Sequence, residues 1–184
     1  MATEKNSQAP ANLEELDYWT FIGLAMDTIS EQLDDPDPAA AELVITLNRA
    51  TNQLIYDLES VVHRPQGLSW SAFRLLFVLW LTGPIRPGQA ARLTGMGRAA
   101  VSQLTRTLIA KGMVKKSPAP DDARTFIIEL TDEGHEYTKR AYTAQNRRES
   151  QWASSLTEVE RTMLVLLLQK LMANRDQMDI RIRE

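Results

Sequence analysis

The sequence has no cysteine and only two histidines, His63 and His135, among its 184 residues. Disulfides, thiol-based redox sensing and cysteine-zinc sites are therefore excluded, and a multi-histidine metal site would need carboxylate ligands as well. No stretch approaches the roughly 20 consecutive apolar residues that cross a membrane. We expect a cytoplasmic protein with no membrane partner.

The chain also lacks the short patterns that accompany common enzymatic chemistry. It contains no glycine-rich phosphate loop, no HExxH zinc spacing and no nucleophile paired with a base. Ser102, for example, has no catalytic partner nearby in the sequence. The sequence therefore predicts neither an enzyme nor a bound cofactor or metal.

Charges of the two signs are separated along the chain. The whole chain carries −3, but residues 1–64 hold three Lys and Arg against twelve Asp and Glu, net −9. Residues 86–124 hold eight Lys and Arg against two Asp, net +6. An acidic protein is not a general nucleic-acid coat, yet a local positive patch attracts the phosphates that a specific binder needs.

That positive segment has the spacing of a helix-turn-helix over residues 87–112. Ala91 is small enough to let two helices approach closely, and Gly95, four positions on, can take the positive φ of a sharp turn. The second helix is expected to start near Gly97 and to end before Gly112, which suits the left-handed position after a helix.

The second helix of the motif has an apolar face and a polar face. Its apolar stripe has the three-and-four spacing of a buried helix side and consists of Val101, Leu104 and Leu108. The opposite side presents Arg98, Ala99, Ser102, Gln103 and Arg106. Arginine can form two hydrogen bonds with guanine, and glutamine can form two with adenine. Short side chains let a helix approach the bases. We predict that these five residues and Gly97 contact DNA in the major groove.

Two short strands are predicted after the helix-turn-helix, at residues 114–116 and 125–130, with turn-forming residues 117–123 between them. In the second strand, Phe126, Ile128 and Leu130 alternate with three other residues, so one face is fit to be buried. The sequence thus predicts a small hairpin, or wing, behind the second helix.

The wing carries its own candidate DNA contacts. Lys115 and Lys116 could bind phosphates, and Arg124 lies where the hairpin tip begins and could enter a narrow minor groove. Asp122 could hold that guanidinium in position. An ordinary surface ion pair, worth at most about 1 kcal/mol, is the alternative for Asp122.

Several short motifs lie between Leu68 and Gly134. They are Ala91–Met96, Val101–Leu104 leading to Lys111–Val114, Asp122–Arg124, and Leu130–Gly134. With them this segment resembles the winged helix-turn-helix core of the MarR family of bacterial transcriptional regulators. Flanking helices extend the resemblance to about residues 38–180. The resemblance implies a homodimer on a palindromic operator, most often a repressor, with a wing arginine at Arg124 that reaches the minor groove.

The predicted fold is mainly α with a small β wing, and it divides into five segments. These are a disordered tail at 1–11, an extra N-terminal helix and linker at 12–36, a dimerisation helix at 37–66, the DNA-binding domain at 67–134, and C-terminal dimerisation helices at 135–184. Apolar terminal helices joined to so small a domain need a partner, and a two-fold copy is the simplest one. The predicted N-terminal helix within residues 12–36 is similar to an extra helix that some branches of the MarR family carry.

Local signals place the ends of these helices. Asn12 with Glu15 resembles a capping box for the first helix, and Asp37 before Pro38 starts a helix that should reach about His63. Ser69 should cap the next helix, whose aromatic stripe is interpreted as core: Trp70, Phe73, Phe77 and Trp80. Further helices should run from Thr131 to about Ala153 and from the capping box at Thr157.

By the same resemblance, an effector pocket would lie between the dimer helices and the winged domain. Residues that could line it are His63, Arg64, Trp70 and Arg74, with Trp19 or Tyr56 as a lid. An arginine near aromatic walls suits an aromatic or phenolic carboxylate. The alternative is that Arg74 is a surface or ion-paired residue and the tryptophans are core. Urate is not predicted, because Arg74 and Leu104 replace the ligand acid and an arginine of the urate-sensing branch.

Two classes of function follow. The first is a ligand-responsive homodimer that binds double-stranded DNA and regulates transcription. The second is a winged-helix adaptor that binds a protein or a ligand and has no affinity for DNA. The net charge of +6 in residues 86–124 favours the first.

Overall fold

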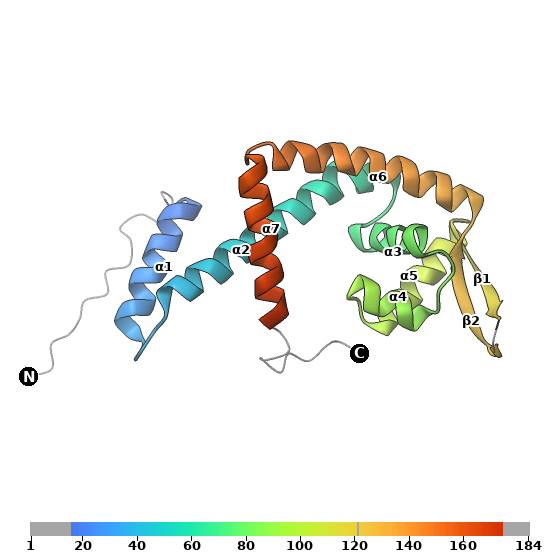
Figure 1. The fold of residues 1–184 in the computed structure, drawn as a ribbon, viewed down its shortest axis with the longest axis horizontal. Coiled ribbons are helices and arrows are strands. Elements are labelled where there is room, and N and C mark those ends of the chain that lie inside the picture. Colours follow the sequence, from blue (N-terminus) through green and yellow to red (C-terminus); the bar gives the residue numbers. More distant parts are fainter. Residues whose placement is uncertain (1–15, 121, 175–184) are drawn as a thin grey trace, which may run out of the picture. The chain divides into compact units, whose positions relative to one another are not determined.

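The computed structural model describes residues 16–120 and 122–174, with the backbone alone for residues 122–124. The described elements are α1 Tyr18–Gln32, α2 Pro38–Leu58, α3 Trp70–Thr82, α4 Pro87–Thr94, α5 Arg98–Ala110, β1 Val114–Ala119, β2 Asp122–Leu130, α6 Asp132–Ala153 and α7 Glu158–Ala173 (Figure 1). They form two compact units, one up to Ile55 and one from Tyr56 onward. The predicted mainly helical fold with a small β wing is confirmed.

The N-terminal unit pairs α1 with the first part of α2. Ile22 is its buried residue on α1, and the Tyr18 hydroxyl donates to Thr46 Oγ1 over 3.3 Å. Asp17 caps α1, since its side chain accepts from the Thr20 amide at 2.8 Å. The predicted capping box at Asn12 and Glu15 lies outside the described residues, and residues 16 and 17 precede α1.

The helix that begins after Asp37 does not stay regular as far as His63. Asp37 accepts from the Ala40 amide at 2.9 Å, as expected of a cap. A π-helical turn at Glu59–His63 and a 3-10 turn at Arg64–Gln66 then end the helix. The Glu59 carboxylate accepts from the Trp70 amide at 3.1 Å, so this irregular segment is tied to the start of α3. The periodicity of side chains along a helix does not predict a hydrogen bond of this kind between two elements.

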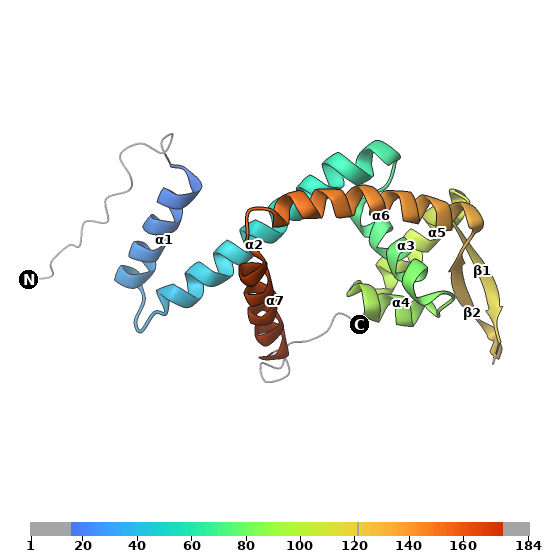
Figure 2. The same ribbon diagram turned by 45° about the horizontal axis from the view of Figure 1, so that its top comes forward.

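The apolar core of the second unit is built on α3. Ser69 caps this helix, as predicted, by accepting from the Ala72 amide at 3.2 Å. Leu75, Leu76 and Leu79 are almost completely buried, and α4, α5, α6 and β2 all pack against α3. Figure 2 shows α3, α4 and α5 grouped beside the β1–β2 hairpin. Each buried leucine stabilises the fold by about 1.5 to 3 kcal/mol.

The aromatic stripe of α3 belongs to this core. Phe73 is buried, and the other three rings are half-buried: Trp70, Phe77 and Trp80. The Phe73 ring stacks on the His63 ring with 4.2 Å between centroids. Tyr142 from α6 lies 4.8 Å from Phe77, so the stripe links α3 to α6.

The wing is longer than predicted. Strands β1 and β2 pair antiparallel from Val114↔Leu130 to Ala119↔Asp122, with a register shift between Pro118 and Ala119. The prediction of a turn over all of residues 117–123 was therefore wrong. Pro118 is compatible with pairing because a two-stranded hairpin leaves one edge of each strand unpaired.

A bridge that the sequence analysis missed attaches the wing to the domain. Ile85, in the loop before α4, exchanges backbone hydrogen bonds of 3.1 and 2.9 Å with Ile128 of β2. Ile128 is completely buried, as its place on the apolar face predicted. Phe126 from the same face is 40% exposed.

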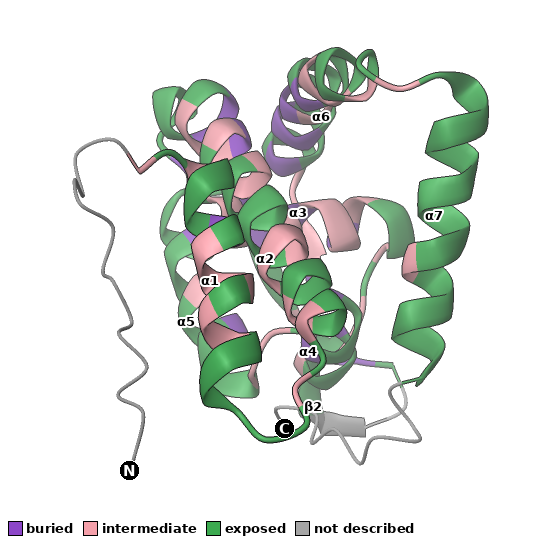
Figure 3. Cartoon of the chain, turned by 90° about the vertical axis from the view of Figure 1, so that its left-hand side faces the viewer, coloured by how far each residue is buried: buried purple, intermediate pink, exposed green. Residues whose placement is uncertain are grey.

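The last two helices begin at their predicted caps. The Thr131 side chain accepts from the Gly134 amide, and Thr157 forms a capping box with Glu160. Helix α7 has no buried residue, although most of its side chains are apolar (Figure 3). Among the described residues, no helix is both long enough and apolar enough to cross a membrane.

Asp57, near the end of α2, joins α2 to α6. Its carboxylate accepts from Arg148 Nε and Nη2, both at 2.6 Å, and from Trp152 Nε1 at 2.8 Å. The hydrogen bonds from Arg148 and Trp152 lower the pKa of Asp57 to about 2. The carboxylate is mostly covered, with 17% of its side chain exposed.

Asp57→Asn should lower the free energy of unfolding at pH 7 by about 1 kcal/mol, a modest amount because Arg148 is one-third exposed. Since the folded pKa of about 2 lies below the ordinary 3.8, this contribution is full above pH 3.8 and is lost as the pH falls through 2. Urea unfolding of wild type and variant from pH 2 to 7 measures it. Asp27→Asn, at an exposed position of α1, is the control, and a difference independent of pH would contradict the assignment.

Gly134→Ala should destabilise the protein by about 1 to 3 kcal/mol, the usual cost of overpacking. An added Cβ at this position would overlap the backbone of Met113, where α6 crosses the start of the wing. Gly88→Ala in α4 is the matched control, since its Cβ would meet open space and gain up to about 1 kcal/mol of helix propensity. Equal urea midpoints for the two variants would contradict the close approach.

Candidate nucleic-acid interface

The helix-turn-helix consists of α4, a tight turn and α5. Gly95 ends α4 with φ of 68°, the left-handed conformation predicted for it. Ala91 is 7% exposed, and its carbonyl accepts from the Met96 amide at 3.1 Å across the turn. Gly97 is the N-cap of α5, and Gly112 after the helix has φ of 72°. The sequence therefore located both ends of the motif.

Helix α5 has the two faces that its sequence predicted. Val101 and Leu108 are completely buried, and Leu104 is half-buried. Thr105, which the sequence analysis had not assigned, is also buried. The candidate base-contacting residues are all exposed: Arg98, Ala99, Ser102, Gln103 and Arg106. The structure thus presents these five side chains on one accessible surface.

The start of α5 is suited to an anion. Gly97 provides no side chain to cap the first turn, and that turn holds no acidic residue. The backbone N–H groups and the positive end of the helix dipole favour a phosphate there. Arg98, at the first position of α5, adds a formal positive charge.

The two wing lysines are exposed, but each has a partner within the wing. Lys115 Nζ lies 3.6 Å from Glu129 Oε1, which also accepts from the Ser117 hydroxyl at 2.7 Å. Lys116 Nζ lies 4.4 Å from the centroid of the Phe126 ring. The cross-strand register creates both contacts, so the sequence analysis could not find Glu129 or Phe126 as partners.

Asp122 and Arg124 belong to β2 by their backbone. Their side chains lie outside the described residues. Arg124 is therefore within a strand rather than in a separate loop, and its contact with DNA stays a prediction.

The candidate effector residues are dispersed. Trp19 belongs to the N-terminal unit and is 72% exposed, and Tyr56 is 67% exposed. Arg64 is exposed and pairs with Glu59 over 3.0 Å. Arg74 donates through Nη2 to the Thr94 carbonyl at the end of α4. The structure brings two of the six into ring contact, His63 and Trp70, with 5.6 Å between centroids.

His63 is fully buried. Burial lowers the pKa of His63, while its Nε2 lies 2.9 Å from Gln145 Oε1 on α6. A hydrogen on Nε2 then donates to Gln145, and Nδ1 is a buried atom without a protein partner in the described structure. His63 thus serves as a link between the π-helical turn and α6.

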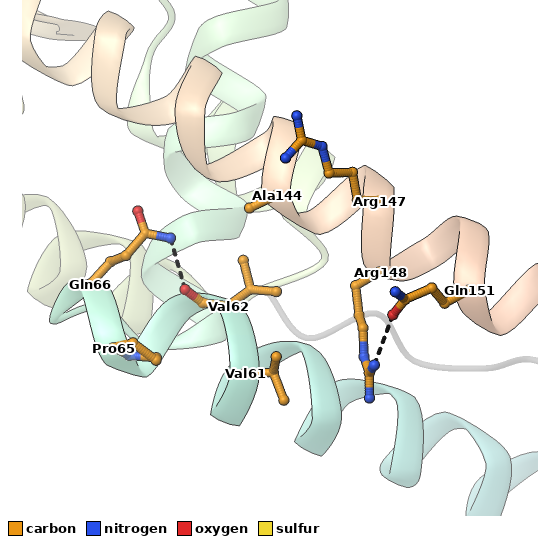
Figure 4. Close-up of a pocket in the computed structure, with 8 residues that line it drawn as sticks. All are labelled: Val61, Val62, Pro65, Gln66, Ala144, Arg147, Arg148 and Gln151. Carbon is orange, nitrogen blue, oxygen red and sulfur yellow. Dashed lines mark hydrogen bonds between the residues drawn. The ribbon is translucent and has the colours of Figure 1, made fainter.

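A shallow groove of about 420 Å³ lies between the same turn and α6 (Figure 4). It is lined by Val61, Val62, Pro65, Gln66, Ala144, Arg147, Arg148 and Gln151. None of the six candidate effector residues lines it. Within the described part of the chain, no group of three or more His, Asp or Glu side chains could hold a metal ion.

Comparison with known proteins identifies this architecture. The model of the MarR family matches residues 66–125. An HTH-type transcriptional regulator of Bacillus subtilis, YwaE, is 29% identical over 135 residues, which cover 73% of this chain and 79% of the relative. The name of this relative describes a regulator of transcription, which supports the prediction that the chain is not an enzyme.

Solved structures have the same fold. A MarR/EmrR family regulator from Acinetobacter sp. ADP1 matches with a TM-score of 0.67 and 25% identity, over 75% of this chain and 97% of that one. Bordetella bronchiseptica BpsR matches with a TM-score of 0.64 and 21% identity, over 69% of this chain and 90% of that one. The latter structure addresses the regulation of BpsR DNA binding by 6-hydroxynicotinic acid.

Proposed function

We propose that this chain, whose residues 66–125 form a MarR-family domain, acts as a homodimer that binds a palindromic DNA operator and represses transcription. The observation that carries the proposal is α5. One side of this helix is buried in the domain, and the other presents Arg98, Ala99, Ser102, Gln103 and Arg106 to solvent. That surface has the residue types that read base edges in a major groove.

Two copies of α5 would occupy successive major grooves of one DNA face. In dimeric helix-turn-helix proteins the half-sites lie about 34 to 36 Å apart, one helical turn of B-DNA. In each half-site, Arg98 and Gln103 would contact bases, while Arg106 and the wing lysines would contact phosphates. By the family resemblance Arg124 would reach the minor groove, and Asp122 belongs to the same wing motif.

Helix α7 supports the homodimer. Its consecutive apolar residues from 163 to 168 cover more than one side of the helix, and a helix that is apolar all round is ordinarily buried. In the described chain these residues are largely exposed, with Met163 at 54% and Leu167 at 56%. A second copy of the chain would cover this contiguous apolar surface, and large exposed apolar patches mark interaction sites.

A small anionic aromatic molecule is the proposed effector that releases the DNA. The regulation of BpsR by 6-hydroxynicotinic acid supports this class of compound. Within the second unit, His63 at the end of the π-helical turn is in ring contact with Trp70, and the exposed Arg64 follows His63 in the chain. A shift of this turn would reach α3 directly through the hydrogen bond from the Trp70 amide to Glu59.

Gln103→Ala should cost about 1 to 3 kcal/mol of binding free energy at one base position, because a base contact is lost. Lys115→Ala should instead weaken binding to all sequences alike and lower the salt slope by about one. Glu129→Gln should instead strengthen binding to all sequences alike, since it frees Lys115 from its ion pair. Fluorescence anisotropy at two salt concentrations, against a selected duplex and a scrambled one, measures all three.

The wild-type titration in that experiment tests the function itself. Sequence-selective binding that decreases with salt would support the regulator. An equal loss on all sequences for Gln103→Ala would remove this residue from base recognition. Absence of binding to any duplex from a random pool, even at low salt, would favour the winged-helix adaptor instead.

Leu167→Glu should convert the dimer to a monomer, because it places a charge within the apolar surface of α7. Gln169→Glu adds the same charge at an exposed polar position of the same helix and is the matched control. Sedimentation velocity at several protein concentrations measures the mass. A Leu167→Glu protein that keeps the mass of two chains would exclude α7 as the dimer interface.

A further inference from the structure

Arg74 of α3 contacts the turn that precedes α5, the proposed recognition helix. Its guanidinium Nη2 donates to the carbonyl of Thr94, the last residue of α4. The same nitrogen lies 3.8 Å from the position where Gly95 would carry a Cβ. The side chain is half-buried and therefore enclosed by the domain on one side.

Thr94 is the centre of the turn. It is 2% exposed, and its hydroxyl donates to the Ala90 carbonyl at 2.7 Å. The hydroxyl oxygen also accepts from the Met96 amide at 3.3 Å. The carbonyls at the end of a helix lack partners within the helix, and buried ones need a donor from elsewhere. Arg74 supplies such a donor and places a positive charge at the negative end of the α4 dipole.

The direction of α5 depends on this turn. Helix α5 begins at Arg98, four residues after Thr94, and Gly95 between them has a left-handed backbone. Apolar packing of Val101 and Leu108 holds α5 to the core but is not directional. A hydrogen bond from the core helix α3 to the turn is directional and fixes where α5 starts.

We propose that Arg74 is a positioning residue for specific DNA binding, which holds the start of α5 in the orientation that base readout requires. The inference rests on the proposed function. Base contacts tolerate displacements of only about 0.5 Å, whereas phosphate attraction is nearly independent of such shifts. Loss of Arg74 should therefore reduce discrimination between sequences more than it reduces general DNA affinity.

This role differs from the one that the sequence suggested for Arg74. As an effector ligand, Arg74 would present its guanidinium to a small anion. As a phosphate contact, it would contribute about one unit to the salt slope. As a positioning residue, it changes the ratio of specific to non-specific affinity and leaves the salt slope unchanged.

The test compares Arg74→Met and Arg74→Lys with wild type. Methionine keeps an unbranched apolar stem without the donors, and lysine keeps a donor and the charge. Arg140→Met, at an exposed position of α6, controls for the loss of one positive charge. Anisotropy titrations use a duplex that wild type selects from a random pool and a scrambled duplex, both at two salt concentrations. Thermal unfolding establishes that each variant is folded at the temperature of the titration.

We expect Arg74→Met to lose about tenfold in affinity for the selected duplex and much less for the scrambled one, at an unchanged salt slope. Arg74→Lys should recover part of the discrimination, and Arg140→Met should retain all of it. Full discrimination in Arg74→Met would overturn the proposal, as would a loss equal on both duplexes with a salt slope lower by about one.

Amide hydrogen exchange of the free protein provides a readout that does not involve DNA. Arg74→Met should exchange faster at the turn from Gly95 to Gly97 than wild type, with protection of α6 unchanged. Unchanged exchange at the turn would overturn the role of Arg74. Failure of wild type to bind any duplex would instead overturn the proposed function, and the exchange result would still decide whether Arg74 holds the turn.

Discussion

The rest of this structure depends on the burial of one apolar helix. Leu75, Leu76 and Leu79 of α3 are removed from water by α4, α5, α6 and β2, which all pack against it. Two residues of α5, Val101 and Leu108, are completely buried in the same core. Removal of water from these side chains holds the elements together, but it does not by itself set the angles between them.

Polar contacts supply those angles at the edges of the core. Glu59 ties the irregular turn to the start of α3, and Arg74 ties α3 to the end of α4. Asp57 joins α2 to α6 through Arg148. In each case a charged group binds across two elements, where its geometry matters more than its small contribution to stability. The proposed base readout by α5 would gain precision from such contacts.

Much of the local structure could be predicted because its causes are local. Caps at Ser69, Thr131 and Thr157 start helices through side chains three residues or fewer from the amides they bind. Gly95 takes its left-handed conformation for reasons internal to the turn. The error in the predicted length of the wing has a non-local cause. The strands of the wing are longer than predicted because β1 and β2 pair across the hairpin.

The sequence by itself determined the helix-turn-helix, the two faces of α5 and the concentration of positive charge around them, because periodicity and turn chemistry act within a few residues. The tertiary structure alone decided the partners of Arg74, His63 and Glu129. Arg74 and His63 contact residues 20 and 82 positions away, and no local pattern encodes a contact over such a separation. A charged or polar side chain can form hydrogen bonds with many alternative partners, and the packed backbone decides which of these partners lies within reach.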